Sequence, residues 1–382
     1  MAIDLAAARE VFAASKDGTV GLEEEFAILD PETLDMVPRF EELRDLAPST
    51  LGQQITGELI KSEIEIVSGR GEDFRDALAR QRGTRRLLFD HAAESRVALG
   101  ATGTHPFADY REQEFIDTEH YRRVAEGLQW VAKRNNTFSL HVHVGINGAD
   151  RVVRTCDRLR TVLPGLLAIS ASSPYLDGMD SGLHSARTQM FTRTFPRCGI
   201  PDAFGGWDGY AEYIDFLVRS RSIVEYTQVW WSVRPHFSFG TVEVRICDAQ
   251  PTATESEALA ALIAAAILQS ARDVDDDRRE WETIPNRLIE ENMWRAIRYG
   301  MDGLYVSPAT GEQREARAVL EDMLEWTAPA RAEHGIPEPA FPDRNSAQRQ
   351  RALIAEGLSP LDVYAATVRE TRETYAQEVP TA

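Results

Sequence analysis

The sequence predicts an α+β fold, in which helices pack on one face of an antiparallel or mixed sheet and the other face is polar. Strand-like segments alternate apolar and polar residues at a period of two, as sheets with one buried face do. They alternate irregularly with helix-like segments, which argues against a doubly wound fold. Of the 382 residues, 43% are hydrophobic and 27% are charged, which is typical of globular proteins. No repeat or long linker divides the chain, so we expect one domain over residues 1–382.

The individual elements follow from the same patterning in chain order. Strands are predicted where apolar and polar residues alternate, over residues 20–30, 53–69, 98–104, 137–147, 227–234 and 240–247. Helices are predicted where apolar residues recur every three or four positions, over residues 74–97, 119–134, 150–170, 210–221, 255–272, 290–300, 314–326 and 346–377. We expect Pro164 and Gly357 to interrupt two helices and Gly300 to end a third. We also expect a turn around Pro235 and a long ordered loop over 181–204, which is rich in Arg, Gly and Pro.

The charge balance and the cysteines exclude several classes of protein. A net charge of −19 repels nucleic-acid phosphate and anionic lipid, so we expect neither nucleic acid nor membrane as a main partner. The apolar run 258–268 is shorter than the roughly 20 residues of a membrane span and is expected to be a buried core helix. Three widely spaced cysteines form no disulfide framework or zinc motif, and the amino terminus has no signal-peptide pattern. The cytoplasm is therefore the expected compartment.

Four of the predicted strands place charged residues on one face and aliphatic residues on the other. The charged faces hold Glu23 and Glu25, then Glu63 and Glu65 with Glu58 just upstream, then His141 and His143, and then Glu243 and Arg245. Any one such strand is explained equally well by a solvent-exposed sheet face. Glu24 falls on the aliphatic side of its strand and is expected to be structural.

Two features of the set favour a functional site over a solvated face. Histidine is scarce in the chain, with 8 residues, yet two lie on one strand face, and the charged faces contain almost no lysine. Converging carboxylates repel one another unless cations neutralise them. Several carboxylates with one imidazole suit Mg²⁺ or Mn²⁺ better than zinc. With an arginine added, such a face has the groups that phosphoryl transfer from a magnesium nucleotide requires.

Six segments, in this order along the chain, resemble the type 2 glutamate–cysteine ligases, also called carboxylate–amine ligases. They are GLEEEFAILD, GTHPF, HVHVG, RTQMFTRTFPRCGIP, WWSVRPHFSFGTVEVRICDAQPT and ENMWRAIRYG, within residues 18–300. The resemblance implies a glutamine-synthetase-like catalytic fold, followed by a helical part over 301–382. It also implies that ATP phosphorylates a glutamate-like carboxylate and that a cysteine-like amine then attacks the acyl phosphate. ATP and Mg²⁺ are the implied cofactors, with Mn²⁺ as a substitute, and a homodimer is compatible with the family.

The resemblance also implies roles for residues that match the family's motifs. Its metal ligands correspond to Glu23, Glu25, Glu58, Glu65, His141 and Glu243. Glu243 and Arg245 are the expected catalytic pair, with Arg245 stabilising the transferred phosphoryl group. Arginines can hold a substrate carboxylate through paired hydrogen bonds, and this role is expected for Arg187, Arg193 and Arg234. His143 and Arg298 are expected to contact the nucleotide.

Other chemistries remain open on the same residues. A binuclear metallohydrolase could use the HxH strand, but it needs further histidines, and His184, His236 and His334 follow in no recognisable ligand context. A magnesium-ATP phosphotransferase would share the site and leave phosphate on its product. A non-catalytic relative would bind nucleotide without turnover.

Overall fold

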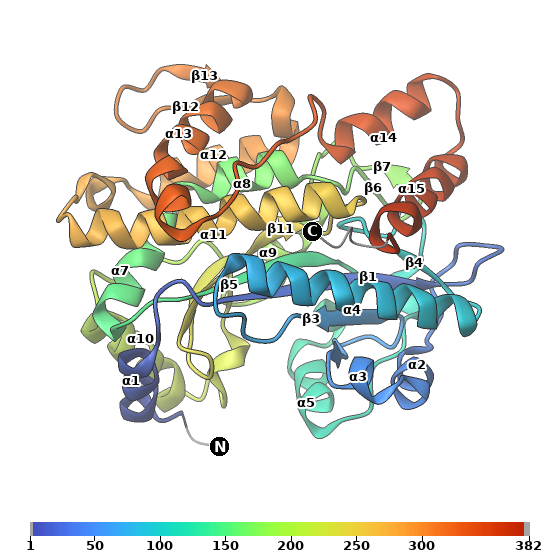
Figure 1. The fold of residues 1–382 in the computed structure, drawn as a ribbon, viewed down its shortest axis with the longest axis horizontal. Coiled ribbons are helices and arrows are strands. Elements are labelled where there is room, and N and C mark those ends of the chain that lie inside the picture. The colour runs from blue at the N-terminus through green and yellow to red at the C-terminus, as the bar shows by residue number, and fades with distance from the viewer. Residues whose placement is uncertain (1–2, 378–382) are drawn as a thin grey trace.

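The computed structural model describes residues 3–377, and its centre is a seven-stranded sheet with the order β10-β11-β5-β1-β3-β2, in which β4 also pairs with β1 (Figure 1). All of its strand pairs are antiparallel. The strands are β1 (Val20–Leu29), β2 (Ile55–Thr56), β3 (Glu63–Val67), β4 (Ala98–Gly100), β5 (Ser139–Gly145), β10 (Val233–His236) and β11 (Thr241–Asp248). This order makes neighbours of the four strands whose charged faces the sequence singled out.

Helices cover the aliphatic face of the sheet. Helix α4 (Phe74–Glu94) packs on β1 and β3, α11 (Ala253–Asp275) packs on β5, and α8 (Leu163–Ser170) packs on β11. Apolar side chains of β5 and β11, such as Val142 and Val244, are completely buried beneath them. In Figure 1, α12 (Asn286–Tyr299) and α13 (Ala316–His334) form a further layer above α8 and α11.

The remaining helices and strands surround this core. The helices are α1 (Leu5–Ala14), α2 (Phe40–Leu46), α3 (Ser49–Gly52), α5 (Glu119–Leu128), α6 (Trp130–Lys133), α7 (Ala149–Leu159), α9 (Ala186–Thr194), α10 (Trp207–Arg219), α14 (Ser346–Ala355) and α15 (Pro360–Tyr375). Three short ribbons pair β6 (Tyr175–Leu176) with β7 (Met179–Asp180), β8 (Cys198–Gly199) with β9 (Trp230–Trp231), and β12 (Leu304–Val306) with β13 (Gln313–Glu315).

The predicted α+β class is confirmed, and so is the buried core helix. Every residue of α11 from Ala258 to Ala271 is buried. Among the described residues, no helix combines the length and the apolar character needed to cross a membrane. The expected single domain over 1–382 stays a prediction, and its first two and last five residues lie outside the described part.

The structure corrects the sequence analysis at several places. Segment 181–204 is not only a loop, because it contains α9. Pro235 does not form the turn but lies within β10, at the edge of the sheet, where a missing N–H is tolerated. Helix α1 was not predicted at all, and α13 runs on to His334 with Pro329 inside it.

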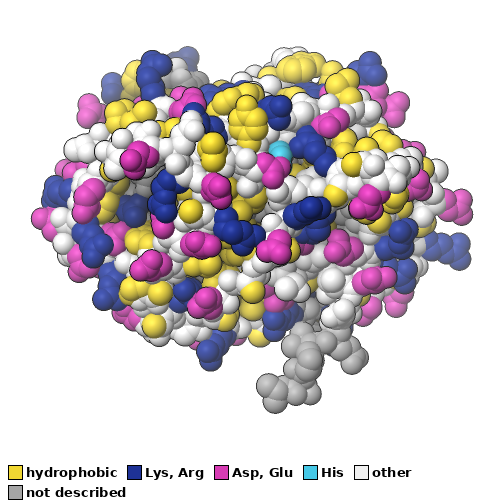
Figure 2. All heavy atoms as spheres, turned by 90° about the horizontal axis from the view of Figure 1, so that it is seen from above, with side chains coloured by type: hydrophobic (Ala, Val, Ile, Leu, Met, Phe, Trp, Pro, Cys, Tyr) yellow, Lys and Arg dark blue, Asp and Glu magenta, His cyan; other side chains and the backbone are white. Residues whose placement is uncertain are grey.

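The surface viewed from above Figure 1 intersperses acidic, basic and hydrophobic side chains (Figure 2). The net charge of −19 is therefore not gathered into one acidic patch on this face. A set of neighbouring carboxylates lies instead inside the molecule, on the face of the sheet opposite to α4 and α11.

Candidate active site

Strand register brings the charged residues of four strands together. Glu23 of β1 stands opposite His141 of β5, and Glu25 stands opposite Glu65 of β3. On the far side of β5, His143 stands opposite Glu243 of β11. Side chains alternate between the faces of a sheet, so all these groups project to the side away from the helical core.

The charged face is not an open solvent-exposed face, because helices and loops cover it and leave a cavity. Helix α5 contributes Tyr121, α9 contributes Arg187 and Phe191, and segment 227–230 contributes Trp230 to the walls of a cavity of about 340 Å³. Predicted site residues that line this cavity are Glu23, Glu25, Glu58, Glu65, His141, Arg187, Arg234, Glu243 and Arg245.

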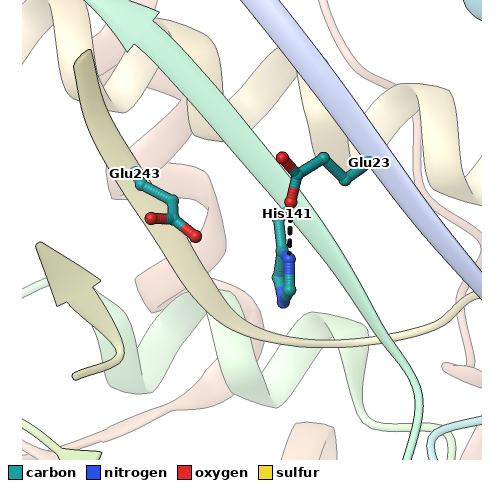
Figure 3. Close-up of side chains that lie close together, drawn as sticks. All are labelled: Glu23, His141 and Glu243. Atoms are coloured by element: carbon teal, nitrogen blue, oxygen red, sulfur yellow. Dashed lines mark hydrogen bonds and ion pairs between the residues drawn. The ribbon is translucent and has the colours of Figure 1, made fainter. Parts of the chain in front are cut away.

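His141 is at the centre of the cluster (Figure 3). Its Nδ1 lies 2.9 Å from Glu23 Oε2, and its Nε2 lies 2.7 Å from Ser139 Oγ. Ser139 Oγ donates to Glu25 Oε2 at 2.6 Å, and this carboxylate also accepts the Ser139 backbone N–H. In Figure 3 the carboxylate of Glu243 projects from β11 into the same space as Glu23 and His141. Neighbouring strands thus fix the position of both carboxylates that flank this imidazole.

Two sets of residues could each hold a divalent cation. Glu23, His141 and Glu243 offer ligand atoms that all lie within 4.8 Å of one another, and Glu25, Glu65 and His141 do the same. Each set has two carboxylates and one imidazole, a donor set that fits Mg²⁺ or Mn²⁺. His141 belongs to both sets, and because a neutral imidazole has one free lone pair, it would ligate a cation in one set while the carboxylates hold a cation in the other.

The carboxyl groups divide into two electrostatic classes. Burial and the charge of Glu25 raise the pKa of Glu58 to about 8. Burial and neighbouring carboxylates raise the pKa values of Glu63 and Glu65 well above the usual value of a glutamate. These three groups have too little positive charge around them. Bound cations would supply it and would ionise them at neutral pH.

Glu23 and Glu243 belong to the second class. Burial raises the pKa of each carboxyl, but His143 and His141 outweigh it at Glu23, and Arg234 and Arg245 outweigh it at Glu243. Both pKa values are held well below the usual range. Arg234 Nε donates to Glu243 Oε2 at 2.6 Å, and Arg245 donates to Glu243 Oε1.

Arg245 shares the cavity face with Glu243 and lies where β11 has a bulge. The pairing of β11 with β5 shifts by one residue between Val244 and Cys247, so two residues of β11 lie opposite a single residue of β5, His141. Such bulges bend a strand locally and are common beside active sites. Arg187 braces the same place, because its guanidinium donates to the carbonyl oxygens of Ile246 and Arg245 at 3.0 and 3.1 Å.

Three predicted residues lie outside the cavity lining. The Arg193 side chain is 50% exposed and faces Glu290 at 4.0 Å, because it is six positions after Arg187 on α9 and therefore on another side of that helix. Arg298 donates to the Gly182 carbonyl from α12, in the helical layer beyond α8. His143 is buried under the lining, where Nδ1 pairs with Thr241 Oγ1 at 3.0 Å and Nε2 lies 3.1 Å from Glu23 Oε1.

Several lining residues were missed. Glu63 was on the predicted charged face but was not chosen as a site residue. His120, Tyr121, Phe191, Thr227 and His236 also line the cavity. They come from helices, loops and a strand end that only the tertiary structure brings together. A strand pattern contains no signal for them.

Glu24 is structural, as its face predicted. Its carboxylate accepts two hydrogen bonds from Arg85, at 2.7 Å each, one from Gln81 at 2.9 Å and one from Ser256. These partners lie on α4 and α11, on the side of the sheet away from the cavity.

Comparisons with known proteins agree with this geometry. The profile of "Glutamate-cysteine ligase family 2" matches residues 19–342. The chain belongs to this family. A Rubrobacter xylanophilus protein named "Putative glutamate--cysteine ligase 2-2" is 37% identical over 361 residues, which cover 93% of this chain and 92% of that protein. A Sorangium cellulosum protein with a name of the same form is 37% identical over 363 residues, covering 91% and 92%.

Solved structures support the fold of this family member. The glutamate–cysteine ligase of Francisella tularensis, solved in complex with AMP, superposes with a TM-score of 0.69 at 10% identity, covering 95% of this chain and 90% of that one. A bifunctional glutathione synthetase from Pasteurella multocida gives 0.68 at 14% identity, covering 97% and 54%. Membership of the family makes the protein an ATP-dependent carboxylate–amine ligase acting on small molecules. Neither the phosphotransferase nor the metallohydrolase alternative is favoured.

Proposed function

We propose that this ligase joins the γ-carboxylate of glutamate, or a close analogue, to the amino group of a cysteine-like acceptor through an acyl phosphate. The observation that carries the proposal is the cavity itself. Two candidate cation sites share His141 there, and Arg245 lies beside them on the bulge of β11.

The cation ligands in this proposal are Glu23, Glu25, Glu58, Glu65, His141 and Glu243. Mg²⁺ bound there, or Mn²⁺ in its place, would screen the phosphate charges of ATP. Arg245 then stabilises the negative charge of the phosphoryl group during transfer, while Arg234 keeps Glu243 ionised and fixed. In this proposal His143 holds Glu23 in place from beneath the cavity lining.

The chemistry balances in two steps. An oxygen of the donor carboxylate attacks the γ-phosphorus of ATP, and ADP leaves. The unprotonated acceptor nitrogen then attacks the acyl carbon, phosphate leaves with the attacking oxygen of the donor, and one proton is lost from the nitrogen. Arg187 is the cavity guanidinium proposed to orient a substrate carboxylate, because Arg234 already donates to Glu243 and to the Val229 carbonyl oxygen. Arg193 and Arg298 lie outside the cavity lining.

ADP release tests the proposal. With Mg-ATP and glutamate, we expect release to depend on an added amine, and we expect mass spectrometry to show the amide. Hydroxylamine, a small nucleophile that traps acyl phosphates as hydroxamates, serves as acceptor when no amino acid does. A product that retains phosphate would favour the phosphotransferase. ADP release that is independent of any carboxylate would contradict the proposed function.

A further inference from the structure

Glu63 is the cavity carboxylate that the proposed chemistry leaves without a role. Its side chain lines the cavity but the residue is only 1% exposed, and its Oε2 has no hydrogen-bond partner among residues 3–377. Neither candidate cation site includes it. Burial of a carboxylate oxygen without a partner is costly, so such a group points to a ligand that supplies the partner.

The position of Glu63 relative to the cation sites limits what that ligand can be. It is two residues from Glu65 along β3, a distance of about 7 Å. It stands opposite Ala27 of β1, whose small side chain leaves room above the sheet. The guanidinium of Arg187 lines the same cavity. Burial has the larger effect and raises the pKa of Glu63, but the charge of Arg187 lowers it, so a negative and a positive group are near each other, one short strand segment away from the proposed cations.

We propose that Glu63 is a specificity-determining residue that binds the α-ammonium group of the donor amino acid, while Arg187 faces the α-carboxylate. This rests on the proposed function, which places the reacting carboxylate at the cations. In an extended glutamate the γ-carboxyl carbon and the α-nitrogen are about 5 Å apart, from ordinary bond lengths. With the reacting carboxylate beside Glu25 and Glu65, the ammonium reaches Glu63.

The assignment predicts which donors the enzyme accepts. Glutarate has both carboxylates of glutamate but lacks its ammonium group. It would leave Glu63 buried without a partner, and sites built to bind a polar group strongly reject analogues that lack it. The enzyme should therefore prefer glutamate to glutarate by about 100-fold or more in kcat/KM.

The test compares these two donors in E63Q, with Mg-ATP and hydroxylamine, which makes the assay independent of the natural acceptor. We expect E63Q to lower kcat/KM for glutamate by about 100-fold and to leave glutarate unchanged or improved. E63D should recover part of the glutamate activity. E65Q, which removes a proposed cation ligand, should lose both donors equally, and E32Q in an exposed turn should change neither.

An equal loss of both donors in E63Q would overturn the assignment and make Glu63 a cation ligand or a structural group. A rise in the KM of cysteine, with glutarate as donor, would instead assign Glu63 to the acceptor amine and would also overturn it. If the wild type turns over neither donor, the proposed function fails. In that case calorimetry with Mg²⁺ measures the binding of glutamate and glutarate to the wild type and to E63Q, and it still decides the role of Glu63. We expect the wild type to bind glutamate more tightly than glutarate, and E63Q to lose this difference.

Discussion

Glu24 and Glu65 have opposite roles although they lie on adjacent strands, and two substitutions separate these roles. Glu24 is paired with Arg85 at 4% and 3% side-chain exposure, on the helix-covered face. Breaking a buried ion pair by removing one partner costs about 3–5 kcal/mol. The amide of E24Q keeps one acceptor oxygen, worth about 1 kcal/mol, so we expect a loss of about 2–4 kcal/mol in the free energy of unfolding. Arg85 keeps its second partner, Glu257.

Glu65 differs because burial and the neighbouring carboxylates Glu23 and Glu58 raise its pKa well above its usual value. Without bound cations this carboxyl therefore destabilises the fold in its charged form. E65Q should unfold at the same temperature as the wild type or higher when EDTA removes metal. It should nevertheless lose ADP release, because a proposed cation ligand is gone.

Thermal unfolding in EDTA and ADP release at 25 °C together test this contrast. For a chain of 382 residues, 1 kcal/mol corresponds to about 1.2 °C, so E24Q should unfold about 2–5 °C below the wild type. Its turnover per folded molecule should remain near that of the wild type. An E24Q protein with unchanged stability and no turnover would refute the reasoning, as would an E65Q protein destabilised as strongly as E24Q.

Three further predictions concern cations, acid and phosphoryl transfer. Mg²⁺ at 100 times its Kd should stabilise the wild type by about 2.7 kcal/mol in thermal unfolding, and E65Q by much less. R245K should unfold like the wild type but lower kcat by about 100-fold or more, since lysine keeps the charge and loses the planar guanidinium. His105 should make stability acid-sensitive, because burial lowers its pKa to about 4. Its Nδ1 accepts the Ala108 N–H and is therefore not free to bind a proton in the folded chain. The unfolded chain binds that proton below about pH 6.5. The free energy of unfolding should therefore be at its full value above about pH 6.5 and should fall by about 2–3 kcal/mol towards pH 4.

Each of these has a control and an outcome that contradicts it. Equal stabilisation of the wild type and E65Q by Mg²⁺ would contradict the assignment of Glu65 as a cation ligand. A kcat of R245K equal to that of the wild type would contradict the proposed role of the Arg245 guanidinium in phosphoryl transfer. H105Q keeps a donor for the Leu34 carbonyl but cannot be protonated, so its stability should fall less between pH 6.5 and 4 than that of the wild type. Parallel pH profiles of the two proteins would contradict the role of His105.

The period-two pattern predicted which strand residues lie on one face, because sheet geometry depends on it. Glu23, Glu25, His141, Glu243 and Arg245 all reach one cavity, since residues two apart share a face and antiparallel pairing aligns those faces. The same rule placed Glu24 on the opposite face. The bulge at Arg245 was not predictable, because a one-residue shift between strands far apart in sequence leaves no local pattern.

Two predicted site residues lie outside the cavity because a helix or the tertiary packing decides their position. A residue in a loop can face any direction, but within α9 residues six positions apart cannot share one face, so Arg187 enters the cavity and Arg193 does not. Arg298 is in a motif of the family, yet its helix lies in the layer beyond α8. The roof over the sheet is built from segments such as α5 that have no pattern of their own pointing to chemistry.

The most direct test of the central claim follows an oxygen atom. Glutamate labelled with ¹⁸O in its γ-carboxylate is turned over with Mg-ATP and the best acceptor found, and the inorganic phosphate is analysed by mass spectrometry. Because a carboxylate oxygen attacks phosphorus and later leaves with it, the account predicts one ¹⁸O atom in each phosphate released. Unlabelled phosphate accompanying labelled amide would contradict an acyl-phosphate ligase.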